Sequence, residues 1–206
     1  GSCSSSDNNT TTQADNITTI TFNPLSAGDP RTTYDNCKIR VTDNASNISN
    51  DLDVSPFTID TIAPTVSSTS PTDNLSSVSV SDNISVTFSE SMTVDNVTTN
   101  TSDTTCSGSL QLSSDNFSSC VQMGSSPTVS NSNQTFTVTP SLKMFYSATY
   151  KIRVTTAAKD SAGNNIASEY TQTDGFKTTI TVPMTAGFAH SCFMLDNGSV
   201  KCWGEN

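Results

Sequence analysis

The stretch Lys151-Ile-Arg-Val-Thr155 occurs twice in this chain, because Lys38-Ile-Arg-Val-Thr42 is identical and lies 113 residues earlier. Apolar and charged residues alternate in both copies, and a period of two predicts a β-strand with one buried face. A tyrosine precedes each copy, an Asp-x-Ala-x-Asn loop follows it, and a strand led by phenylalanine comes next. The repeat therefore predicts that part of one structural unit recurs in the chain.

The repeat also predicts the domain organisation. Residues 63–180 hold every part of a complete unit, whereas residues 1–62 hold the C-terminal part of a similar one. Pro64 at the junction cannot donate a hydrogen bond to a β-ladder, which suits a boundary between modules. Residues 181–206 do not match the pattern of either copy and are expected to form a third part.

Further segments alternate in the same way, namely residues 84–88, 135–138 and 52–54. Turn-forming residues separate them, for example at 71–74 and 131–133. Residues that favour helices are scarce, and no stretch has a convincing helical period. Short strands at regular spacing predict an all-β sandwich or barrel.

Composition excludes some functions. The chain has 206 residues with 19 acidic and 9 basic side chains, a net charge of −10, and 33% hydrophobic residues. Nucleic-acid binding needs clustered basic residues, so it is not expected. No apolar run reaches the roughly 18 residues of a membrane span. Low apolar content alone is compatible with disorder, but the alternating runs indicate a β protein with a thin core.

The six cysteines form three sequence-local pairs, although other connectivities are open. Zinc sites need closely spaced cysteines or histidine partners, which are missing here. Disulfides persist in oxidising compartments, so the pattern predicts a secreted or cell-surface protein. A lipid-bearing cysteine ahead of a serine-rich tether is an alternative for the first one, and free thiols are an alternative for the last pair. The predicted pairs are Cys3 with Cys37, Cys106 with Cys120, and Cys192 with Cys202.

Residues 63–178 contain the segments Ala63-Pro-Thr-Val66, Asn83-Ile-Ser-Val-Thr-Phe-Ser-Glu-Ser-Met92, Thr135-Phe-Thr-Val-Thr-Pro140, Tyr150-Lys-Ile-Arg-Val154, Asp160-Ser-Ala-Gly-Asn164 and Phe176-Lys-Thr178. With these segments, residues 63–178 resemble a bacterial Ig-like domain of the S-layer-protein type, and residues 20–60 resemble the end of another. The resemblance implies Ig-like β-sandwich modules, one partial and one complete. Within this pattern, Glu90 and Met92 are interpreted as packing and capping residues.

The C-terminal part is different. The segments Ala186-Gly-Phe-Ala-His-Ser-Cys192 and Asp196-Asn-Gly-Ser-Val-Lys-Cys-Trp-Gly204 resemble a regulator-of-chromosome-condensation repeat, the unit of a β-propeller blade. The resemblance implies a β-hairpin from an incomplete blade, with a structural role for His190. It does not carry nucleotide exchange to this chain. The expected fold is therefore all-β throughout.

The aspartates have two interpretations. Aspartate commonly makes turns through hydrogen bonds from its side chain to the backbone. The resemblance to Ig-like adhesin arrays instead implies calcium, held by Asp43, Asp60 and Asp160, with Asp73 and Asp174 as looser candidates. Carboxylate oxygens are the ligands that this hard cation prefers. Turn formation is the more economical of the two interpretations.

No catalytic constellation accompanies the single histidine, so an enzyme is not expected. The sequence favours a non-catalytic structural or adhesive segment of a secreted or cell-surface repetitive bacterial protein. Its expected partners are other modules of the same chain, neighbouring copies, or host or environmental surface ligands. One alternative is a subunit of an extracellular filament joined by strand addition. Another is a module that binds a glycan or a protein.

Overall fold

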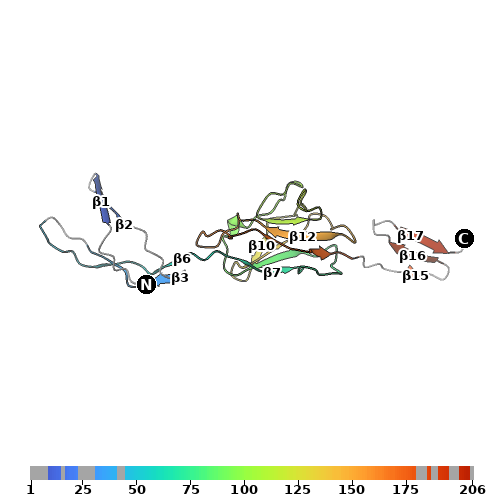
Figure 1. The fold of residues 1–206 in the computed structure, drawn as a ribbon, viewed down its shortest axis with the longest axis horizontal. Helices are drawn as coiled ribbons and strands as arrows, with labels where there is room; N and C mark the ends of the chain where they lie inside the picture. The colour runs from blue at the N-terminus through green and yellow to red at the C-terminus, as the bar shows by residue number, and fades with distance from the viewer. Residues whose placement is uncertain are drawn as a thin grey trace. The chain divides into compact units, whose positions relative to one another are not determined.

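The computed structural model describes residues 9–14, 17–22, 31–40, 45–179, 185–186, 190–194 and 200–204. These residues form short strands joined by turns (Figure 1), with one 3₁₀ turn, η1 (Val94–Asn96). The chain divides into two compact units, Gly1–Ile62 and Ala63–Asn206. Within the described part of the chain, no helix is long and apolar enough to cross a membrane.

Two sheets form the body of the second unit. The first sheet has the order β10-β11-β8-β7 and is antiparallel throughout. In the second sheet, β12 pairs antiparallel with β9, β13 and β14. The strands are β7 (Val66–Ser70), β8 (Ile84–Phe88), β9 (Leu110–Ser113), β10 (Thr128–Ser130), β11 (Thr135–Val138), β12 (Thr149–Val154), β13 (Tyr170–Thr171) and β14 (Phe176–Lys177).

One hydrophobic core lies between these sheets, and the alternating sequence explains it. Every second residue of β8 and β12 is buried, as the period of two predicts. Phe88 and Phe136 meet edge to face, with ring centroids 5.8 Å apart. Tyr150 and Phe176 stack with centroids 5.9 Å apart. All four rings belong to a single buried cluster, so both sheets contribute to one core.

An interruption separates β13 from β14 along β12. Gln172 is 2% exposed, and its Oε1 accepts a hydrogen bond from the Ile152 backbone N–H at 3.0 Å. Its Nε2 donates to Thr69 Oγ1 and to the Pro71 carbonyl, both at 3.0 Å. The side chain thus supplies an acceptor for a backbone N–H of β12 and ties that strand to the end of β7 in the other sheet.

The first unit contains two-stranded antiparallel pairs. Within it, β3 pairs with β6, and β4 pairs with β5. Tyr34 lies opposite Phe57, and their rings stack with centroids 5.1 Å apart. The strands of this unit are β1 (Asn9–Ala14), β2 (Ile17–Phe22), β3 (Arg31–Tyr34), β4 (Lys38–Ile39), β5 (Leu52–Asp53) and β6 (Phe57–Asp60).

The C-terminal strands form a small antiparallel sheet in the order β15-β16-β17. Its bounds are β15 (Thr185–Ala186), β16 (His190–Met194) and β17 (Val200–Gly204). The predicted hairpin is present as β16 and β17, and β15 adds a third strand to it. The predicted role of the His190 side chain falls outside the described part of the structure.

Candidate metal centre

Asp160 lies in the loop after β12 and is fully buried. Its Oδ1 accepts hydrogen bonds from the backbone N–H groups of Ala162, at 2.9 Å, and Asn164, at 2.8 Å. Its Oδ2 accepts from the Asn164 side-chain amide at 2.9 Å. The residue therefore shapes its own Asp-Ser-Ala-Gly-Asn loop, as the turn interpretation requires. Two carboxylate oxygens have about four lone-pair sites, so accepting capacity is left over.

Glu90 lies in the loop that follows β8, and this loop is bound to the Asp160 loop. The Ser161 N–H donates to the Ser91 carbonyl at 3.0 Å. The Thr93 hydroxyl donates to the Asp160 carbonyl at 2.7 Å, and the Thr93 N–H donates to the Lys159 carbonyl at 2.9 Å. These bonds fix the backbone that directly follows Glu90 relative to Asp160.

Asp60 is the last residue of β6. Its Oδ2 pairs with the Arg31 guanidinium, with Nε at 2.9 Å, and its Oδ1 accepts from the Ile62 N–H at 2.9 Å. Arg31 lies directly opposite on β3, so the strand register places the ion pair. The carboxylate is thus oriented by its own β-pair.

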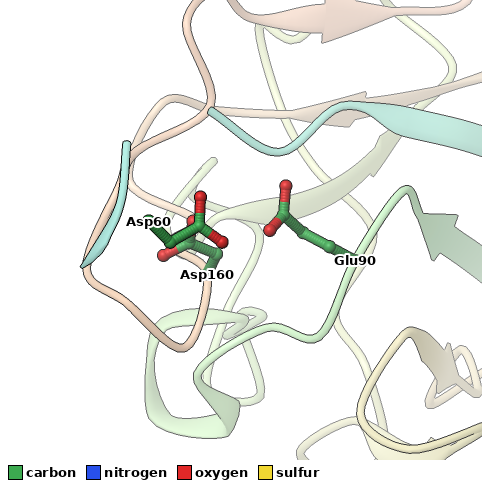
Figure 2. A group of neighbouring side chains, drawn as sticks. All are labelled: Asp60, Glu90 and Asp160. Atoms are coloured by element: carbon green, nitrogen blue, oxygen red, sulfur yellow. The ribbon is translucent and has the colours of Figure 1, made fainter. Parts of the chain in front are cut away.

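Asp60, Glu90 and Asp160 each offer a carboxylate oxygen within 4.8 Å of the other two (Figure 2). Like charges at this spacing repel one another unless cations or hydrogen-bond donors compensate. An all-oxygen set of carboxylates suits Ca²⁺, which takes about six to eight oxygen ligands. Neighbouring carbonyl groups and water would complete such a shell.

The sequence prediction and this group overlap in two residues. Asp60 and Asp160 were both expected, while Asp43 lies outside the described residues. Glu90 was assigned to packing and capping and is the carboxylate that sequence reasoning missed. A useful signal was its position in the Phe-Ser-Glu-Ser-Met run directly after a strand, where loop residues project from the end of a sheet.

Other aspartates serve as turn caps. Asp73, a looser metal candidate, accepts hydrogen bonds from the N–H groups of Thr173, Asp174 and Gly175. Burial acts to raise its pKa, but these backbone donors outweigh it and the pKa lies below its usual value. Hydrogen bonds from the Ser119 hydroxyl and N–H, and from Ser113, lower the pKa of Asp115 to about 2. Both carboxylates organise loops around them.

Two predicted disulfides join described residues. Cys106 pairs with Cys120, with Cα atoms 4.9 Å apart. Cys192 pairs with Cys202 at a Cα separation of 4.0 Å, and the two lie directly opposite on β16 and β17. Cys37 is also disulfide-bonded, while its predicted partner Cys3 lies outside the described residues.

Solved structures with some similarity are those of a bacterial surface-layer protein, SbsC. Domains 1–6 of SbsC share 18% identity with a TM-score of 0.42, over 68% of this chain and 19% of that one. The N-terminal part of SbsC gives 18% identity and a TM-score of 0.42, over 69% of this chain and 33% of that one. The chain therefore spans less than two thirds of these proteins. No curated protein matches the chain.

Family comparison gives two matches. Residues 184–206 match the regulator of chromosome condensation repeat, in agreement with the resemblance of the C-terminal segment. Residues 60–179 match the bacterial Ig-like domain, a range that includes Asp60, Glu90 and Asp160 and covers more than half of the chain. The chain belongs to the bacterial Ig-like domain family.

Proposed function

We propose that this chain is a non-catalytic spacer segment of a secreted or cell-surface bacterial protein built from repeated modules. The observation that carries the proposal is the recurrence of one structural element in both units. Tyr150 lies opposite Phe176 on paired strands with stacked rings, and Tyr34 lies opposite Phe57 in the same way. A chain that repeats a packing unit in tandem extends reach without adding a chemical site.

The covalent cross-links support this role. Cys106–Cys120 and Cys192–Cys202 form in oxidising surroundings, which agrees with a location outside the cytoplasm. A surplus of acidic side chains, with a net charge of −10, keeps an extracellular segment soluble. The partners on this proposal are further modules of the same polypeptide or neighbouring copies of it.

A spacer must resist extension, and pulling on single molecules tests this. We expect the complete module to unfold in one discrete step. The Cys106–Cys120 disulfide joins residues 14 positions apart and prevents the segment between them from extending in that step. Because an extended residue spans about 3.6 Å, reduction should lengthen the step by about 50 Å.

The control is a chain in which Cys106 and Cys120 are both alanine, which should show the longer step under oxidising and reducing conditions alike. Extension without any discrete step, at forces near the noise level, would argue against a load-bearing spacer. If reduction left the step length unchanged, the disulfide would not lie in the segment that extends when the module unfolds.

We further propose that Asp60, Glu90 and Asp160 bind Ca²⁺. The specific observation in favour is the spacing of three carboxylate oxygens within 4.8 Å, with Arg31 paired to Asp60. A cation would relieve repulsion between carboxylates at this spacing. Turn formation by Asp160 is compatible with this role, because its hydrogen bonds leave accepting capacity free.

Thermal unfolding with calcium or with a chelator tests the calcium proposal. Binding to the folded state should raise the unfolding temperature, by an amount equivalent to about 2.7 kcal/mol at a calcium concentration 100-fold above Kd. Glu90→Gln should remove this increase. Glu169→Gln serves as the matched control, since Glu169 pairs with Arg153 and is not in the group. Equal unfolding temperatures with calcium and with chelator would contradict calcium binding and leave turn formation as the interpretation of the aspartates.

A further inference from the structure

The loop between β11 and β12 presents two large apolar side chains to solvent. Leu142 is 80% exposed and Phe145 is 74% exposed, the largest values among the exposed hydrophobic residues described. Met144, between them in sequence, is buried in the core. Contiguous apolar area on the surface of a domain often marks a place where another surface packs, whereas singly exposed apolar side chains are common.

The backbone of this loop is firmly held. The Met144 N–H donates to the Val80 carbonyl at 2.9 Å, and the Phe145 N–H donates to the Tyr150 hydroxyl at 2.8 Å. The Thr178 hydroxyl donates to the Phe145 carbonyl at 2.7 Å. Leu142 and Phe145 are therefore presented by a preorganised loop, which lowers the entropic cost of packing against a partner.

The bond from Thr178 also fixes where the loop lies. Thr178 follows β14 and is among the last residues of the Ig-like match, so Phe145 lies beside the point where the chain leaves this domain. The next described strand, β15, begins at Thr185. Seven peptide steps can span at most about 25 Å when extended. The C-terminal sheet is thus tethered within reach of Leu142 and Phe145.

The C-terminal sheet has apolar side chains of its own at its surface. Val200 and Trp203 on β17 are each 59% exposed and, being three positions apart on one strand, lie on opposite faces of the sheet. A small antiparallel sheet is marginal in water until it packs a face against another element. The β11–β12 loop and the C-terminal sheet therefore both carry exposed apolar area, and its burial would be favourable.

We propose that Leu142 and Phe145 form a docking surface for the β15–β17 sheet of the same chain. The tether favours this occupant over a second copy, because it gives the sheet a high effective concentration next to the loop. Docking would restrict the joint between the Ig-like domain and the repeat that follows it. The inference goes beyond the spacer function and does not depend on calcium.

Trp203 is the only tryptophan, so its fluorescence reports on β17 alone. In the full chain, we expect Leu142→Ser/Phe145→Ser to shift the emission to longer wavelength and to raise quenching by acrylamide about twofold, because the indole loses apolar cover. Phe145→Leu should keep most of the original emission. Val94→Ser is the matched control, since Val94 is an exposed apolar residue on η1, and it should change nothing.

Two results would overturn the proposal. The first is identical emission and quenching in the double serine variant and the unaltered chain. The second is an effect that disappears on dilution, which would assign the surface to a second copy. Because Cys192–Cys202 closes the β16–β17 hairpin covalently, its register is retained in all variants.

Discussion

Gly175→Ala is expected to lower the free energy of unfolding of the Ig-like module by about 3 kcal/mol or more, through combined backbone strain and overpacking. Gly175 has φ +80°, in the left-handed region that favours glycine. A Cβ atom there would overlap the Tyr150 carbonyl oxygen and lie 2.9 Å from Lys151 Cγ. The lysine side chain can move away, but the carbonyl belongs to β12 and cannot. Urea-induced unfolding measures the change.

The surrounding hydrogen bonds make local relaxation costly. The Gly175 N–H donates to Asp73 Oδ1 at 2.6 Å, and its carbonyl accepts from the Asn74 N–H at 2.6 Å. Any shift of the Gly175 backbone away from Tyr150 would stretch both bonds. The strain therefore cannot be relieved by moving one residue.

Gly163→Ala separates the two contributions to this loss. Gly163 also has a positive φ, +98°, but nothing lies within 4 Å of the position its Cβ would occupy. Only the conformational cost of about 1–2 kcal/mol is then expected. Equal losses for Gly163→Ala and Gly175→Ala would contradict the close approach at Tyr150.

Alternation in the sequence predicted the central strands because burial on one face leaves a direct trace. Ile84, Val86 and Phe88 are all buried in β8, and Tyr150, Ile152 and Val154 are all buried in β12. The disulfide between β16 and β17 was predicted for a similar reason, since a tight turn sets which residues face each other. A local sequence pattern is therefore sufficient to predict a strand or a contact that residues close in sequence determine.

Contacts across the sandwich could not be predicted in this way. Asp73 caps the N–H groups of Thr173 to Gly175, about 100 positions further along the chain, and its sequence surroundings suggested only a turn or a metal ligand. Glu90 was missed because the other two members of the group lie far from it in the sequence. Gln172 lies among polar neighbours in the sequence, and these give no sign that the fold buries it.

Gln172→Leu is expected to cost about 3 kcal/mol, because a buried group that loses its partner costs about 1–3 kcal/mol. Leucine fills a similar volume but leaves the Ile152 N–H without an acceptor. It also removes the donor to Thr69 Oγ1 and the Pro71 carbonyl, so the link from β12 to β7 is lost. Urea-induced unfolding gives the size of the loss.

Gln172→Glu tests the same link through pH. The carboxylate can still accept from Ile152, but it cannot donate to the Pro71 carbonyl, and burial of its charge raises its pKa in the folded state. The variant should therefore be most destabilised at neutral pH and should recover towards the unaltered chain as pH falls, since the protonated acid regains a donor.

Gln122→Leu is the control for Gln172→Leu. The Gln122 amide donates to the Thr101 carbonyl in a more exposed setting, so a much smaller loss of stability is expected. If Gln172→Leu and Gln122→Leu were equally stable, Gln172 would not be the link between the two sheets.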